Sequence, residues 1–145
     1  MKRYFLTVAI AIVAVAAFAQ EKHQSGSKTQ PPTAVQSSFE KDHPKATRVN
    51  WNREDQNFEA NFIENKNVMS AVYNSSGELQ ETEIEISKGN LPANVLTYIQ
   101  QHYKGNIKEA AKITKRNGDI NYEAEVNDKD VIFDKDGHFI KEQKG

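Results

Sequence analysis

The sequence predicts an α+β domain in which two helices cover one face of a curved antiparallel sheet. Short segments of alternating apolar and polar residues, separated by turns rich in Gly, Asn and Asp, are typical of consecutive antiparallel strands. Two segments with apolar residues at helical spacing, each opened by a proline, predict the helices. Both patterns occur twice in the same order, about 60 residues apart. This order predicts a helix and four strands, followed by a second helix and four strands.

An export signal is predicted before this domain. Lys2 and Arg3 precede an uncharged, mostly apolar run over residues 4–18, and 17–19 read Ala-Phe-Ala, an A-x-A cleavage motif. A transmembrane anchor is the alternative, but the run falls short of the about 20 apolar residues that span a bilayer. We therefore expect residues 1–19 to form a signal peptide that is cleaved after Ala19. The mature protein is then periplasmic in a host with two membranes and carries no membrane span.

A polar leader follows the signal. Residues 20–31 contain no apolar residue except Pro31. Such a stretch cannot offset the entropy of ordering the chain, so we expect it to be disordered. The folded domain is then expected over residues 32–145.

An internal repeat divides this domain into two halves, 32–88 and 90–143. Segments 32–35 (PTAV) and 73–77 (YNSSG) match 92–95 (PANV) and 133–137 (FDKDG), both at a spacing of 60. Segment 58–62 (FEANF) matches 122–126 (YEAEV) at a spacing of 64, which a four-residue insertion before this strand, compensated after it, explains. Several matches in one order favour tandem half-repeats. Because about 55 residues make only a marginal core alone, the halves are expected to share one core.

The first half opens with a helix that begins near Pro32, carries Val35 and Phe39 on one stripe, and ends at Pro44. Period-two alternation or short apolar runs then predict four strands. These strands cover residues 47–52, 58–62, 67–73 and 79–87.

The second half opens at Pro92, and its helix carries Val95 and Ile99 at i, i+4 spacing before Gly105 ends it. A strand around Ile113 precedes Asn-Gly at 117–118, a strong hairpin signal. Further strands follow at 120–126, at 131–133 and after the Asp-Gly turn at 136–137. The eight strands form either one curved sheet or two abutting sheets.

Composition and motifs argue against several functional classes. The 145 residues carry 19 basic and 20 acidic side chains, a net charge of -1, which does not suit a nucleic-acid-binding surface. The absence of cysteine excludes disulfides, thiolate metal sites and a cysteine nucleophile. The sequence contains no G-x-S-x-G, G-x-G-x-x-G, Walker or H-E-x-x-H motif, and its four histidines lack metal-ligand spacing. We therefore expect no enzymatic activity and no cofactor.

One weak metal pattern remains. Asp134-x-Asp136-Gly137 resembles a fragment of a calcium loop. Strands are expected on both sides of it, and the matching segment 74–77 keeps the turn without the acids. Asp and Gly also favour hairpin turns for backbone reasons, so a turn is preferred and calcium stays the alternative.

The candidate partner-binding residues lie on the predicted solvent-facing side of the sheet. Glu59, Asn61, Glu123 and Glu125 alternate with apolar residues that should be buried. Trp51 is added as an anchor, because an exposed tryptophan is a natural binding residue. The alternatives are solubility for the acidic face and a core position for Trp51.

The motifs of the half-repeats resemble those of a known family. Pro44-Lys45-Ala46, Val49-x-Trp51, the aromatic-Glu-Ala segments beginning at Phe58 and Tyr122, and Leu91-Pro92 carry the resemblance. In these features the chain is similar to the PepSY-like family of small exported bacterial proteins, over about residues 32–142. That family's fold is similar to β-lactamase inhibitory protein. The resemblance implies two tandem helix-plus-four-strand units whose open sheet face and loops bind other proteins.

Taken together, these observations predict an exported, non-enzymatic binding module for an exported or envelope protein or peptide, of an inhibitor-like kind. The alternative is an envelope protein that binds a small ligand or calcium. An open edge strand could pair two copies, so we expect a monomer or a weak dimer.

Overall fold

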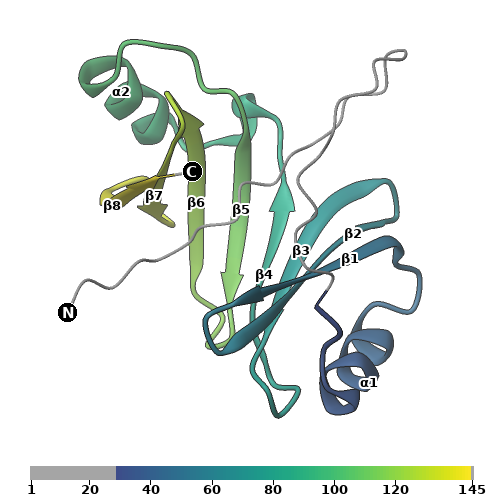
Figure 1. Cartoon of the computed structure of the whole chain (residues 1–145). Helices are drawn as coiled ribbons and strands as arrows, with labels where there is room; N and C mark the ends of the chain where they lie inside the picture. Colours follow the sequence, from purple (N-terminus) through teal and green to yellow (C-terminus); the bar gives the residue numbers. More distant parts are fainter. Residues whose placement is uncertain (1–28, 145) are drawn as a thin grey trace, which may run out of the picture.

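The computed structural model describes residues 29–144. The predicted signal peptide and residues 20–28 of the leader lie outside the described residues. A helix followed by four strands occurs twice, in the predicted order (Figure 1). In chain order the elements are α1 (Thr33–Asp42), β1 (Thr47–Glu54), β2 (Asn57–Glu64), β3 (Asn67–Tyr73), β4 (Leu79–Glu85), the short 3-10 helix η1 (Lys88–Asn90), α2 (Ala93–His102), β5 (Ala110–Lys115), β6 (Ile120–Val126), β7 (Lys129–Asp134) and β8 (Phe139–Lys144).

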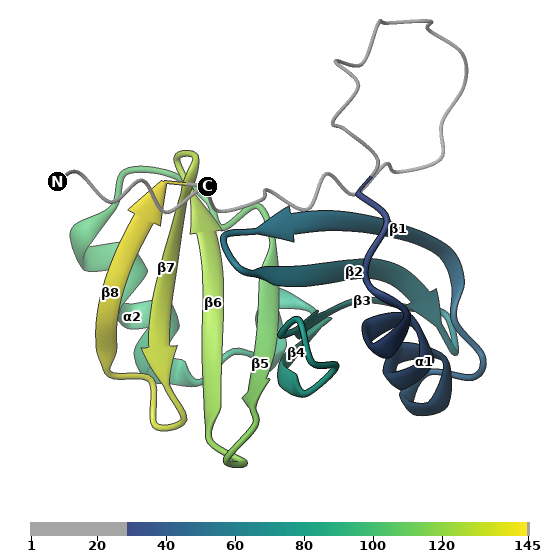
Figure 2. The ribbon, with the colours of Figure 1, turned by 60° about the horizontal axis from the view of Figure 1, so that its bottom comes forward.

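All eight strands form one antiparallel sheet in the order β1 to β8, so each strand pairs with its neighbours in the chain. The open question of one sheet or two is settled by β4 and β5, which pair from Glu81↔Lys115 to Glu85↔Ala111. Among the described residues, β1 and β8 are the edge strands of this sheet. In Figure 2, β1 and β2 run across the direction of β5–β8, as expected when strand twist accumulates over a large sheet.

The register places both helices on the same face of the sheet. Directly opposed residues of an antiparallel pair point to one face. One such row crosses six strands, from the core under α1 to the core under α2, through Phe62, Met69, Ile84, Lys112, Tyr122 and Phe133. Figure 1 shows the two helices at opposite ends of the molecule. The prediction that the helices cover one face is confirmed.

The expected single core is replaced by two. Val35 and Phe39 of α1 pack against buried residues of β2 and β3 such as Phe62, whereas Val95 and Ile99 of α2 pack against β5, β6 and β7. The reason lies where the halves meet. There the helix-covered face carries the pairs Thr82↔Thr114 and Ile84↔Lys112, so polar side chains separate the apolar clusters.

Two equivalent turns fix the helices to the sheet. Gly77 follows β3 and Gly137 follows β7, with φ of +86° and +82°. A Cβ atom added to Gly77 would lie 2.7 Å from the backbone oxygen of Ala34, and one added to Gly137 would lie 2.9 Å from the Cβ of Asn94. Only glycine therefore allows each turn to pass beneath the first turn of its helix. Within residues 29–144, neither helix is long and apolar enough to cross a membrane.

Replacing either turn glycine with alanine should destabilise the fold strongly. Gly118 offers a matched control, because its φ is +88° but no atom lies within 4 Å of the added Cβ. Gly118→Ala should cost about 1 kcal/mol through backbone strain alone. Gly77→Ala and Gly137→Ala should each cost about 3 kcal/mol, since a clash with the helix is added. Urea unfolding measures the three values, and equal losses would show that the contacts with the helices contribute nothing.

Candidate partner-binding surface

The opposite side of the sheet carries no helix among the described residues, and we call it the helix-free face. Its register follows from rows such as Asn61↔Ser70↔Glu83↔Ile113 and Ala111↔Glu123↔Ile132. In Figure 2 this face of β5–β8 is turned to the viewer, with α2 behind the strands. Its central residues are Glu59, Asn61, Ser70, Val72, Glu81, Glu83, Ala111, Ile113, Glu123, Glu125, Asp130 and Ile132.

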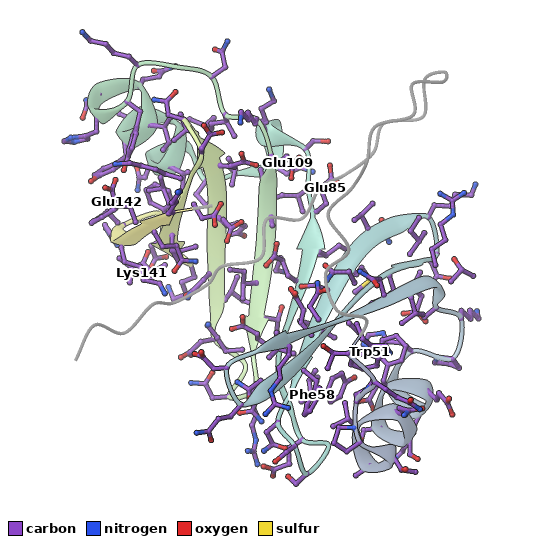
Figure 3. All side chains as sticks on the ribbon, viewed as in Figure 1. Trp51, Phe58, Glu85, Glu109, Lys141 and Glu142 are labelled. Atoms are coloured by element: carbon purple, nitrogen blue, oxygen red, sulfur yellow. The ribbon has the colours of Figure 1, made fainter. Side chains whose placement is uncertain are left out.

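Four of the five predicted site residues lie together on this face: Glu59, Asn61, Glu123 and Glu125. Trp51 does not join them. It pairs with Ala60 in the sheet and its ring packs edge-on against Phe39 at 5.2 Å, so it lies half-buried against the core beside α1 (Figure 3).

The helix-free face is less solvated than the alternation suggests. Glu59 and Asp130 are only 7% and 8% exposed, and the apolar residues between the acids are buried as well. Glu59 was expected to be solvent-facing, and the structure corrects this. The missed signal is the near-continuous apolar character of the short runs 68–73 and 131–133. Such runs are typical of strands that are buried on both faces.

Burial and mutual repulsion raise the pKa of the carboxyls on this face. Burial, together with the charges of Glu59 and Glu81, raises the pKa of Glu83 to about 8. Burial, together with the charges of Glu83 and Asp130, raises the pKa of Glu123 to about 9. Glu83 and Glu123 therefore hold protons at neutral pH.

Smaller upward shifts accompany these two. The pKa of Glu59 is raised by burial, although hydrogen bonds from Asn61, at 3.2 Å, and from Ser70 oppose the rise. Burial comes first for Asp130 and Glu109 too, and in both cases the charge of Glu125 adds to the rise in pKa. In Figure 3, Glu109 and Glu85 lie beside each other, and the charge of Glu85 also raises the pKa of Glu109.

Two of the cations near this face are already engaged, whereas Lys141 lies at its margin on β8, opposite Ile132. Lys115 forms an ion pair with Glu81. The Nζ atom of Lys108 lies 3.2 Å from Glu125 and 2.6 Å from Asp128. By contrast, Glu83, Glu123 and Asp130 have no hydrogen-bond or ion-pair partner within residues 29–144. The centre of the face is thus acidic and lacks counter-charge.

A separate recess of about 290 Å³ opens beside Trp51. Its wall includes His43, whose Nδ1 atom lies 3.0 Å from Glu64 Oε2, while the buried Nε2 atom has no partner among the described residues. The lining residues are Gln36, Phe39, Glu40, His43, Pro44, Ala46, Val49 and Trp51.

The acidic residues of the alternative calcium site lie in the turn after β7, where Asp134 stabilises the backbone. Ligand atoms of Asp134, Asp136 and His138 lie within 4.8 Å of one another. However, Asp134 Oδ1 accepts hydrogen bonds from the backbone N–H groups of Asp136 and His138, both at 2.9 Å, which lowers the pKa of Asp134. Asn74 makes the equivalent bonds, both at 3.0 Å, in the first half. An uncharged amide therefore performs the same structural task.

The carboxyls of the helix-free face should make stability fall as the pH rises. Glu83 and Glu123 have pKa values of about 8 and 9 in the folded chain, against 4.5 when exposed, so the folded state binds more protons between these limits. Their contribution is complete below pH 4.5 and is lost as the pH rises through 8 to 9. We expect the melting temperature to be lower at pH 9 than at pH 6 by roughly 5 °C or more.

Thermal unfolding of two variants tests the cause of this pH dependence. Glu83→Gln combined with Glu123→Gln should remove most of the difference, because neither side chain then titrates. Glu40→Gln, on the exposed side of α1, should leave it unchanged. A melting temperature of the wild-type chain that is flat between pH 6 and pH 9 would contradict the assignment.

Comparisons with known proteins agree with this architecture. The solved structures that resemble it include a BLIP-like protein from Bacteroides fragilis, with 19% identity and a TM-score of 0.60 over 81% of this chain and 89% of that one. A DUF2874 family protein from Bacteroides ovatus has 22% identity and a TM-score of 0.63 over 80% and 89%. One of the "putative periplasmic proteins" of Bacteroides eggerthii has 14% identity and a TM-score of 0.66 over 80% and 90%.

At these identities the structural matches establish the fold alone. No curated protein sequence matches the chain. The family model described as "Putative beta-lactamase-inhibitor-like, PepSY-like" matches residues 56–141. That match covers more than half of the sequence, and the chain therefore belongs to the β-lactamase-inhibitor-like, PepSY-like family.

Proposed function

We propose that this chain is an exported, non-enzymatic binding module for a protein or peptide partner, acting in an inhibitor-like manner. The observation that carries the proposal is the helix-free face, where Glu83, Glu123 and Asp130 form no ion pair or hydrogen bond with any residue of 29–144. Unpaired carboxyls on a sheet face cost free energy in the isolated chain, and a complementary partner would recover it. The likeness to a BLIP-like protein supports an inhibitor-like role.

The arrangement of side chains favours binding over catalysis. A raised pKa alone would also suit an acid–base catalyst. Nucleophilic catalysis needs a hydroxyl or thiol activated by a base, and within residues 30–143 no hydrogen bond joins a Ser, Thr or Tyr hydroxyl to a histidine. The acids also lie on a regular sheet surface, which suits an extended contact with a partner.

The proposal also includes export of the chain, its evolution by duplication of one half, and its oligomeric state. The sequence supports a signal peptide over residues 1–19, cleavage after Ala19 and a periplasmic destination. Tandem duplication of the halves 32–88 and 90–143 is supported by the repeated element order and by the equivalent turns at Gly77 and Gly137. A monomer or weak dimer suits a sheet whose edge strand β8 has Phe139 and Ile140 41% and 49% exposed.

Capture of a partner by the mature chain tests the proposal. The chain from Gln20 onward, immobilised, should retain a specific protein from the host's envelope fraction, more strongly at low salt than at moderate salt. Glu123→Lys should reduce capture roughly tenfold or more, because a central carboxyl that a cationic partner would ionise and pair with is replaced by a positive charge that repels that partner.

A matched variant controls for net charge. Glu40→Lys makes the same change on α1 and should capture the partner as well as the wild type does. Melting temperatures of both variants establish that they are folded. Equal capture by Glu123→Lys and the wild type would remove the helix-free face from the proposal.

The alternative function is binding of calcium by the turn after β7, because ligand atoms of three residues lie within 4.8 Å there. We expect millimolar calcium chloride to leave the melting temperature unchanged, since Asp134 is occupied by backbone N–H groups. A rise that Asp136→Asn abolishes, and that magnesium chloride does not reproduce, would establish the calcium alternative instead.

A further inference from the structure

The unpaired acids on the helix-free face limit what chemistry a ligand can have. Asp130 is only 8% exposed, and its carboxylate has no hydrogen-bond or ion-pair partner within the described residues. Val131 faces the core beneath α2, so Asp130 points to the opposite side, directly across from Glu125 and diagonal to Glu123. A buried polar group without a partner is costly and calls for a donor from elsewhere.

Small side chains lie between these acids. Ala111 lies directly opposite Glu123 and diagonal to Glu83, and Ser70 lies directly opposite Glu83 on its other side. Both small residues are buried, so the longer acidic side chains around them form the surface. A ligand group that approaches from solvent therefore meets several carboxyls.

The spacing of the acids fits an extended donor better than a metal ion. Within residues 29–144, the group of three ligand atoms that fall within 4.8 Å of one another is at Asp134, Asp136 and His138, and it excludes Glu83, Glu123 and Asp130. A calcium ion needs six or more oxygens at short range. An arginine guanidinium presents five N–H donors in a plane, and a lysine ammonium presents three, so either can join carboxylates on different strands.

We propose that the helix-free face binds a cationic side chain, arginine or lysine, of a polypeptide partner, seated over Ala111 between Glu83, Glu123 and Asp130. This assignment rests on the proposed binding function and specifies the chemistry of the partner. The cation provides the missing donors and cancels the mutual repulsion of the acids. Partners that carry an acidic or neutral residue at this point are rejected, because the carboxyls then stay unpaired.

Binding of the cation is coupled to release of protons. The charged groups that raise the pKa of Glu83 and Glu123 are all acidic. Besides these two residues themselves, they are Glu59 on β2, Glu81 on β4, Glu109 before β5, Glu125 on β6 and Asp130 on β7. Of the cations, Lys115 and Lys108 are paired with Glu81 and Glu125, and Lys141 lies on β8 across from Ile132. A bound cation favours the ionised acids, so affinity should increase as the pH rises from 6 towards 9.

Synthetic peptides test the assignment directly. The probe is a capped Gly/Ser peptide with three arginines, and its control replaces each arginine with citrulline, which keeps the shape and removes the charge. Calorimetric titration at low salt, at pH 6 and pH 8.5, in two buffers of different ionisation enthalpy, gives the affinity and the protons released. Amide chemical shifts of the labelled chain locate the contact.

The expected result is binding of the arginine peptide at least tenfold tighter than the citrulline peptide, tighter at pH 8.5, with proton release and shifts at β4–β7. Glu83→Gln combined with Glu123→Gln, or Asp130→Asn alone, should weaken binding about tenfold. The control pair Glu40→Gln and Asp55→Asn, which removes two charges from exposed positions, should not.

Several outcomes would overturn the assignment. One is equal binding of the arginine and citrulline peptides, and another is an arginine effect that survives in the Glu83/Glu123 variant. If calcium chloride shifts the amides of β4–β7 and displaces the peptide, the site binds a metal ion and not a cationic side chain.

Two further outcomes separate the cation site from the proposed function. If the peptides do not bind while the wild type and the Glu83/Glu123 variant capture an envelope partner equally, the proposed function stands and the cation site is wrong. If the peptides bind but no partner is captured, the cation site stands without the proposed function.

Discussion

The hydrogen-bonded pairing of β4 with β5 is the constraint on which the rest of the structure depends. It joins two small helix-and-sheet units through five consecutive residue pairs, from Glu81↔Lys115 to Glu85↔Ala111. Each unit has its own apolar cluster beneath its own helix, and clusters of this size are marginal alone. The backbone hydrogen bonds between β4 and β5 therefore join the two units, because the polar side chains at the junction do not link the two apolar clusters. These side chains are Thr82, Thr114 and Lys112.

The same pairing creates the acidic centre of the helix-free face. Glu83 comes from the first half and Glu123 from the second, and they approach only because β4 and β5 lie side by side with Ala111 and Ile113 between them. Each half contributes acids that would be ordinary on a sheet exposed to water. Brought together and partly buried, they repel one another and retain protons. The candidate site is thus a property of the joined sheet and of neither half alone.

Local signals in the sequence predicted most of the fold. Proline-opened apolar stripes predicted both helices, period-two alternation predicted the strands, and Asn-Gly at 117–118 predicted the turn between β5 and β6. Alternation also assigned Glu59, Asn61, Glu123 and Glu125 to one face. What it could not give is how deeply that face is buried, because burial there depends on the twist of eight strands.

Two further features could not be predicted from local signals. Trp51 continues the alternation of Val49, for which both an anchor and a core position were open, and the register with Ala60 places it half-buried against Phe39. Two separate cores arise because three of the four residues that pair across β4 and β5 on the helix-covered face, Thr82, Thr114 and Lys112, are polar. Pairing between distant segments decides both features, and periodicity within one segment carries no information about it.

Strand order that follows chain order also shapes how the molecule assembles. Six of the seven strand pairs join segments linked by a short turn, so most of the sheet forms with little loss of loop entropy. The exception is β4 with β5, whose connection encloses η1 and α2. Each half can therefore gather locally, and the late step is the closure of this one long loop. In such a sequence of events the acids from the two halves meet only at the end, when the backbone that holds them has already formed.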